Sequence, residues 1–118
     1  MPDARLVYVT AASPEEARRI ATAAVEERLA ACANILGEIE AVFFWNGGAQ
    51  NERETALILK TAADRLDALT ARIKALHSYD EPCVAALPIV GGSESFLAWI
   101  EAETRPDSGG STPAGDTA

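Results

Sequence analysis

The chain has 118 residues, which is enough for one domain and too few for two of ordinary size. Apolar residues make up 48% of it and charged residues 24%, a soluble composition that can bury a core without disulfides. Eighteen acidic and ten basic residues give a formal net charge of −8, which argues against nucleic acid or an anionic membrane as the main partner, because clustered Lys and Arg bind both.

The N-terminal part predicts a strand and then a capped helix. Residues 1–5 lack the basic-then-apolar pattern of a signal peptide, and no apolar run reaches the roughly 18–20 residues of a membrane span, so we expect a cytoplasmic protein. Residues 6–10 are apolar and rich in β-branched side chains, which favours a strand. Ser13, Pro14 and Glu16 then form a capping box that predicts a helix. Apolar residues follow at helical spacing: Ala17, Ile20, Ala21, Ala24 and Val25.

The middle of the chain predicts a β-hairpin. The extended region 33–45 contains Gly37, which indicates a bulge or bend. Residues 45–48, Trp-Asn-Gly-Gly, are a turn signal, and a second strand is expected over 53–61.

The remainder predicts a helix, a strand and a last short helix. Residues 62–76 carry leucine and isoleucine at helical steps, and residues 83–90 are strand-like. Pro88 in that strand favours an edge position or a bulge. Ser93 is the expected cap of the last helix, whose apolar residues are Phe96, Leu97, Trp99 and Ile100.

This order, β-α-β-β-α-β-α, predicts an α+β, ferredoxin-like βαββαβ(α) fold with a four-stranded antiparallel sheet and helices on one face. We expect the folded domain to span residues 1–105. Residues 106–118 contain no large apolar side chain and are expected to be a disordered tail.

Both faces of the predicted hairpin are apolar. Phe43 and Trp45 point to one face, and Val42 and Phe44 point to the other. Because the helices cover mainly one face, we expect a homo-oligomer to cover the other. The alternative is that the last helix folds over the second face.

The segment 77–83, His-Ser-Tyr-Asp-Glu-Pro-Cys, concentrates groups that can bind a metal. His77 is the only histidine, and imidazole, carboxylate and thiolate together suit a borderline or soft divalent ion such as copper or zinc. The candidate ligands are therefore His77, Asp80, Glu81 and Cys83. The alternative is that a charged His77 stabilises the C-terminus of the preceding helix while the two acids are merely solvated.

The sequence gives less support to a disulfide, a nucleophilic cysteine or an anion site than to a metal site. Cys32 and Cys83 are far apart and favour two small buried side chains over a disulfide. Cys83 activated by His77 would make a nucleophile, but no nucleophile elbow or Gly-rich oxyanion loop accompanies the pair. Residues 91–93, Gly-Gly-Ser, could hold an anion at the start of the last helix, although a turn and a cap explain them equally.

Several segments together resemble the CutA family of divalent-cation tolerance proteins. They are residues 27–35 (Glu-Arg-Leu-Ala-Ala-Cys-Ala-Asn-Ile), 44–47 (Phe-Trp-Asn-Gly), 59–61 (Leu-Lys-Thr), 77–82 with 86–89, and 96–100 (Phe-Leu-Ala-Trp-Ile). The resemblance implies a ferredoxin-like fold, a homotrimer, a cytoplasmic location and a role in tolerance of divalent metals. It further implies copper(II) binding as in some members, no organic cofactor and no enzymatic activity.

Carried over residue by residue, the resemblance implies a metal ligand at His77 and a structural role for Cys32. This chain departs from the family at two points. Residues 10–12, Thr-Ala-Ala, lack the cysteine that some members have after the first strand, and Cys83 stands where members often have Glu.

A second interpretation is a small-molecule signalling module of the nitrogen-regulatory PII type, with ligand sites at the clefts between subunits. Trp45, Lys60 and Tyr79 would line such a cleft, and Lys60 would meet an anionic ligand.

Overall fold

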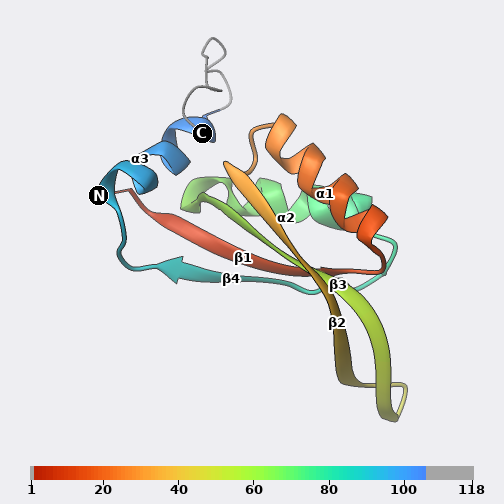
Figure 1. Ribbon diagram of the computed structural model, residues 1–118. Helices are drawn as coiled ribbons and strands as arrows, with labels where there is room; N and C mark the ends of the chain where they lie inside the picture. The colour runs from red at the N-terminus through yellow and green to blue at the C-terminus, as the bar shows by residue number, and fades with distance from the viewer. Residues whose placement is uncertain (1, 106–118) are drawn as a thin grey trace.

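The computed structural model describes residues 2–105 and shows one four-stranded antiparallel sheet with three α-helices (Figure 1). The predicted α+β, ferredoxin-like fold is confirmed. The predicted tail, residues 106–118, lies outside the described residues. In chain order the elements are β1 (Ala4–Ala11), α1 (Pro14–Glu26), β2 (Cys32–Trp45), β3 (Gly48–Ala62), the 3-10 helix η1 (Ala63–Arg65), α2 (Leu66–Leu76), β4 (Val84–Ile89) and α3 (Glu94–Glu103).

The strand order in the sheet is β2-β3-β1-β4, so β2 and β4 are the two edges. Pro88 lies in β4, so its predicted position on an edge strand is confirmed. Proline is tolerated there because the outer side of an edge strand needs no backbone N–H for pairing. The predicted turn lies between β2 and β3, where Asn46 and Gly47 have positive φ values of 52° and 80°. β3 begins at Gly48 and not at residue 53, so the hairpin is longer than predicted.

The main core lies between the sheet and the pair α1 and α2, which cover the same face (Figure 1). Val9 pairs with Leu57, and Val7 pairs with Leu59, and all four side chains are fully buried. The helices complete this core with residues that include Ile20, Leu69 and Ile73.

Helix α3 forms a second, smaller cluster at one end of the sheet. Leu97 and Ile100 of α3 pack there with Ala4 and Ala31. Ser93 caps the helix as predicted, because its Oγ accepts a hydrogen bond of 3.3 Å from the backbone N–H of Phe96.

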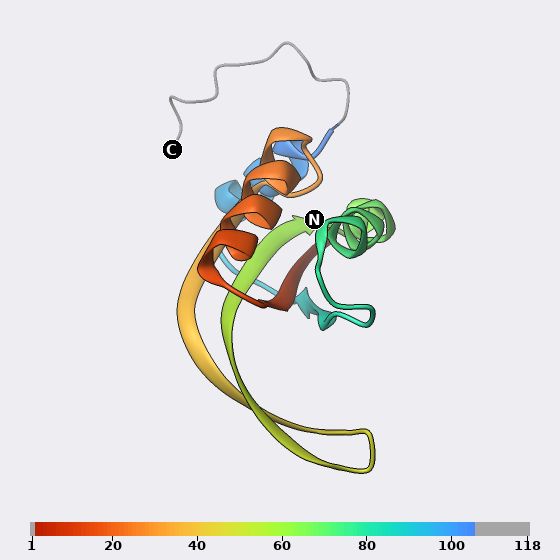
Figure 2. The same ribbon diagram turned by 90° about the vertical axis from the view of Figure 1, so that its right-hand side faces the viewer.

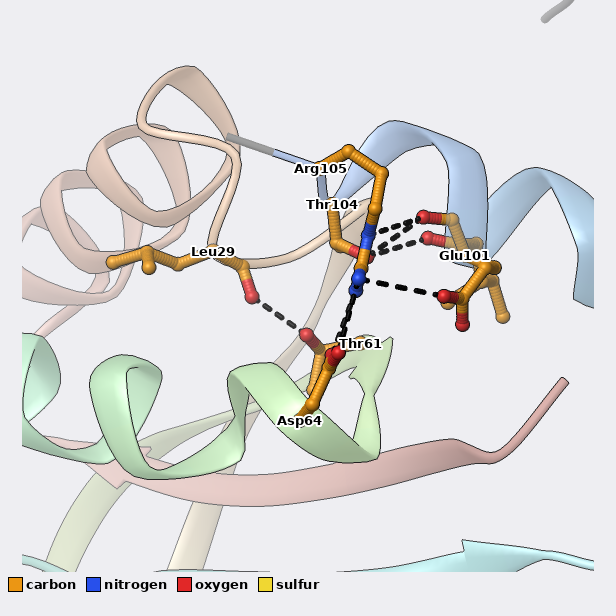
Figure 3. A network of polar contacts seen from close by, with 7 residues as sticks. Leu29, Thr61, Asp64, Glu101, Thr104 and Arg105 are labelled. Atoms are coloured by element: carbon orange, nitrogen blue, oxygen red, sulfur yellow. Dashed lines mark hydrogen bonds and ion pairs between the residues drawn. The ribbon is translucent and has the colours of Figure 1, made fainter. Parts of the chain in front are cut away.

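Arg105 ties the end of α3 to η1, as Figure 3 shows. Its guanidinium donates to both carboxylate oxygens of Asp64, at 2.7 and 3.0 Å, and also contacts Glu101. Next to it, the Thr104 hydroxyl is buried and donates to the backbone carbonyl of Ile100 at 2.9 Å. Hydrogen bonds and ion pairs of Thr104 and Arg105 therefore hold the last described residues against the rest of the domain.

The outer half of the β2–β3 hairpin extends beyond the helices and curves away from the rest of the sheet, and we call it the arm (Figure 2). Val42 is 69% exposed and Phe44 is 75% exposed in the arm. On the β4 edge Leu87 is 53% exposed. Helix α3 thus does not cover these apolar side chains within one chain.

The bulge expected at Gly37 is confirmed. The register runs Ile35 to Leu57 and then Gly37 to Ala56, so Leu36 is an extra residue without a partner on β3. Gly37 has φ +119°, a conformation that a side chain would disfavour.

Candidate functional site

His77 is the C-terminal cap residue of α2, and its side chain is fully buried. Its Nε2 lies 2.8 Å from the backbone oxygen of Thr10 and must donate to it, because a carbonyl can only accept. Its Nδ1 lies 3.1 Å from the backbone nitrogen of Tyr79 and 3.2 Å from Oε2 of Glu16. Both ring nitrogens therefore have partners within the chain, and neither points to solvent.

Glu16 is buried against His77, and it belongs to the predicted capping box. The Ser13 Oγ accepts from the backbone N–H of Glu16 at 3.1 Å, as predicted. The Glu16 carboxylate accepts from the N–H of Ala12 at 3.2 Å, one residue before the cap. Burial raises the pKa of Glu16, but hydrogen bonds with Ser78 and Ala12 and the charge of His77 lower it, so that the pKa lies below its ordinary value of 4.5.

We expect the stability advantage of wild type over Glu16→Gln to shrink as the pH falls below about 4.5. A carboxyl with a depressed folded pKa stabilises the fold above its unfolded pKa, and this contribution disappears as the pH falls through the folded pKa. Urea unfolding of both proteins at several pH values from 7 downward measures the difference. Two curves that stay parallel through this window would remove Glu16 from the acid response.

Tyr79 links the loop after α2 to β3. Its hydroxyl donates to Oε2 of Glu54 at 3.0 Å, and its ring lies 4.8 Å from the ring of His77, centroid to centroid. Burial, the hydrogen bond to Glu54, and the charges of Glu54, Glu52 and Glu16 raise the pKa of Tyr79 to about 12. Tyr79 is therefore neutral at physiological pH and acts as a hydrogen-bond donor.

The thiol of Cys83 lies in the same region. Cys83 is exposed as a residue, but partial desolvation of its thiol raises its pKa, the charge of Glu54 raises it further, and a hydrogen bond with the Thr10 side chain lowers it. Because the net direction is upward, the free thiol is poorly suited to act as a nucleophile at neutral pH. Cys32 is also a free thiol, half-buried, and burial raises its pKa while the charge of Lys60 lowers it.

The predicted metal ligands are not gathered into one cluster. Asp80 and Glu81 are exposed, whereas the ring of His77 is buried. Residues 2–105 contain no group of three or more His, Cys, Asp or Glu side chains that could hold a metal ion by themselves.

The predicted cleft residues are also apart within one chain. Trp45 pairs with Gly48 at the tip of the arm, and the stretch of β3 from Gly48 to Lys60 is about 40 Å long. Lys60 donates to Oδ1 of Asn34 at 2.7 Å and lies 5.9 Å from the centre of the Phe96 ring. Tyr79 and its partner Glu54 lie between these two ends.

Sequence reasoning missed Glu54, which is only 7% exposed. It stands in the polar run 51–55, Asn-Glu-Arg-Glu-Thr, which reads as solvent-exposed. The available signal was the alternation of the predicted strand, which places Glu54 on the same face as Ala56 and Ile58.

Comparison with known proteins gives one consistent result. The profile of a family described as CutA1 divalent ion tolerance protein matches residues 5–103. The chain is 47% identical over 100 residues to Protein CutA 1, chloroplastic, of Oryza sativa subsp. japonica, which covers 85% of this chain and 56% of that protein. It is 43% identical over 95 residues to the divalent-cation tolerance protein CutA of Archaeoglobus fulgidus, which covers 80% of this chain and 92% of that protein.

Solved structures agree with the sequence matches. The crystal structure of CutA1 from Oryza sativa superposes with a TM-score of 0.85 at 45% identity, covering 88% of this chain and 95% of that one. The structure of the periplasmic divalent cation tolerance protein CutA from Archaeoglobus fulgidus gives 0.84 at 40% identity, covering 86% and 99%. The chain spans about half the length of the two chloroplastic relatives, from Oryza sativa and Arabidopsis thaliana.

Proposed function

Because the chain belongs to the CutA family of divalent-cation tolerance proteins, we propose that it is a homotrimer that binds a divalent ion of the copper type and serves in the response to such metals. The observation that carries this proposal is the family match, which covers residues 5–103 and so includes parts of all four strands and all three α-helices. A role in tolerance rather than in catalysis fits the raised pKa of the Cys83 thiol.

Uncovered apolar side chains support self-association. They lie on the arm at Val42 and Phe44 and on the open β4 edge at Leu87, and a monomer rarely leaves this much apolar surface in contact with water. The two open sheet edges also carry unpaired backbone groups that another copy can cover.

We propose that the segment 77–83 supplies the metal donors. Asp80, Glu81 and Cys83 are exposed and can meet an ion directly. His77 can join them only if one ring nitrogen exchanges its present partner, Thr10 at Nε2 or Tyr79 and Glu16 at Nδ1, for the metal.

The cytoplasmic location expected from the N-terminus stays a prediction. Related proteins carry names that place one in the chloroplast and another in the periplasm. None of the helices within residues 2–105 is long and apolar enough to cross a membrane.

We expect copper(II) to bind the wild-type protein in a calorimetric titration and the affinity to fall at least tenfold in Cys83→Ser, because a thiolate is the strongest soft donor of the segment. Cys32→Ser is the matched control and should bind as wild type does. A His77→Ala variant that binds with unchanged affinity would remove His77 from the site. Light scattering on the same samples should give three times the 12.4 kDa of one chain, and a monomer mass would contradict the trimer.

A further inference from the structure

Glu54 is a buried acid without a basic partner in the part of the chain that the structure describes. It is 7% exposed, and its Oε2 accepts a hydrogen bond of 3.0 Å from the neutral hydroxyl of Tyr79. The other buried acid of the described residues, Glu16, has His77 at 3.2 Å and Arg19 at 3.8 Å. A buried charge without an opposite charge is costly, because it has lost water and gained no replacement. Glu54 therefore needs a cation that its own chain does not supply.

Lys60 is the opposite case on the same strand. Its Nζ donates to Oδ1 of Asn34 at 2.7 Å and lies 5.9 Å from the centre of the Phe96 ring, and both groups are uncharged. Seven of the ten basic side chains form ion pairs with acids of the described chain. The three that form none within the described residues are Lys60, Arg65 in η1 and Lys74 in α2. Of these three cations only Lys60 lies on the sheet.

Glu54 and Lys60 lie on the same face of β3, because residues an even number of positions apart in a strand point to the same side. The helices α1 and α2 cover the opposite face, which holds Leu57 and Leu59 (Figure 1). Six strand residues span about 20 Å, far beyond the roughly 4 Å of an ion pair, so Glu54 and Lys60 of one chain cannot meet. We call their side of the sheet the bare face, and it also holds Leu6, Tyr8, Ile58 and Leu87.

We propose that the bare face binds a second copy of the chain, so that Lys60 of one copy pairs with Glu54 of its neighbour. The two charges are complementary, and the apolar side chains between them supply contact area. In a closed ring each copy gives Lys60 to one neighbour and Glu54 to the other, so a trimer holds three such pairs and leaves neither charge over. Tyr79 holds the Glu54 carboxylate in place for this contact. The inference rests on the homotrimer of the proposed function and names the residues that join its copies.

Exchange of the two charges tests the pair in the full-length protein. We expect Lys60→Glu and Glu54→Lys each to raise at least tenfold the protein concentration at which the trimer is half dissociated. Sedimentation velocity over a dilution series measures this concentration. The double variant should return to within threefold of wild type, because the pair forms again with its charges reversed. A double variant as weak as the single variants would overturn the inference.

Two matched controls carry the same charge changes elsewhere. Lys74→Glu changes an exposed lysine of α2, and Glu52→Lys changes an exposed acid two residues before Glu54 on β3. Each should shift the half-dissociation concentration less than twofold. Rescue of Lys60→Glu by Glu52→Lys instead of Glu54→Lys would overturn the assignment of Glu54.

The Glu54→Lys variant places an ammonium at a buried position, so circular dichroism must first show that it folds. Should it fail to fold, Glu54→Gln and Lys60→Gln replace the two charge-exchange variants. Their double variant should assemble no more weakly than either single variant, since each single change already breaks the same pair. Losses that add in the double variant would overturn the inference.

The outcomes separate the inference from the proposed function. If wild type is a trimer and the folded single variants assemble as it does, the inference is wrong and the trimer remains. If wild type is a monomer at every concentration, both are wrong. If assembly is unchanged and calorimetry shows that inorganic phosphate binds wild type but not Lys60→Glu, the partner of Lys60 is an anion in solution and the inference is wrong.

Discussion

The Leu59→Ala substitution is expected to lower the free energy of unfolding by about 3–5 kcal/mol, because it removes a fully buried side chain and leaves a cavity. Leu59 lies near the C-terminal end of β3, pairs with Val7 and belongs to the core that α1 and α2 cover. Urea unfolding followed by circular dichroism measures the change. Protein concentration must be held fixed, since assembly contributes to the apparent stability.

The matched control is Val90→Ala, which shortens an apolar side chain that is 93% exposed. Its effect should stay within about 0.5 kcal/mol. A loss below about 1 kcal/mol for Leu59→Ala would mean that the sheet and the helices do not pack around this residue as the structure describes.

The second large effect is expected from His77→Ala, with a loss of about 2–3 kcal/mol. The substitution leaves the backbone oxygen of Thr10 and the N–H of Tyr79 without their partners, and it removes the neighbour of the buried Glu16 carboxylate. Thermal or urea unfolding at pH 7 measures the loss.

His77→Gln provides the comparison, since its amide nitrogen can still donate to the Thr10 oxygen. We expect this variant to recover about 1 kcal/mol relative to alanine. Equal stability of wild type and His77→Ala would contradict a structural role for the buried imidazole and would favour its release to a ligand.

The fold was predictable because its signals are local. Ser13 and Ser93 each bond to the N–H three residues on, as capping patterns require, and Gly37 sits at the observed bulge. The start of β3 was placed five residues late, because residues 49–52 show no apolar alternation and lie on the arm, away from the helices. The pairing with β2 extends the strand there without the signal of a buried face.

The site was less predictable because it depends on residues far apart in sequence. His77 stands in a polar segment that reads as solvent-exposed. Only the tertiary packing of the end of α2 beside β1 and α1 brings Thr10 and Glu16 to its ring. The capping box predicts the backbone bond of Glu16, but it does not reveal that the carboxylate is shared with a residue 61 positions later. Glu54 was hidden for the same reason, since Tyr79 covers it from a different loop.

The extra residue at the bulge has a consequence for how this chain tolerates changes in length. Before Leu36, the odd-numbered Ile35 faces the same way as Leu57, toward the helices; beyond it, the odd-numbered Ile39 pairs with Glu54 on the opposite face. A deletion of Leu36 itself would remove the bulge and leave every pair between β2 and β3 unchanged, because Ile35 and Gly37 would then be successive residues opposite Leu57 and Ala56. A deletion of a paired residue such as Glu38 would instead shift the rest of the arm by one position and exchange its two faces. The chain can therefore lose a residue at the bulge at a lower structural cost than in the paired part of the arm.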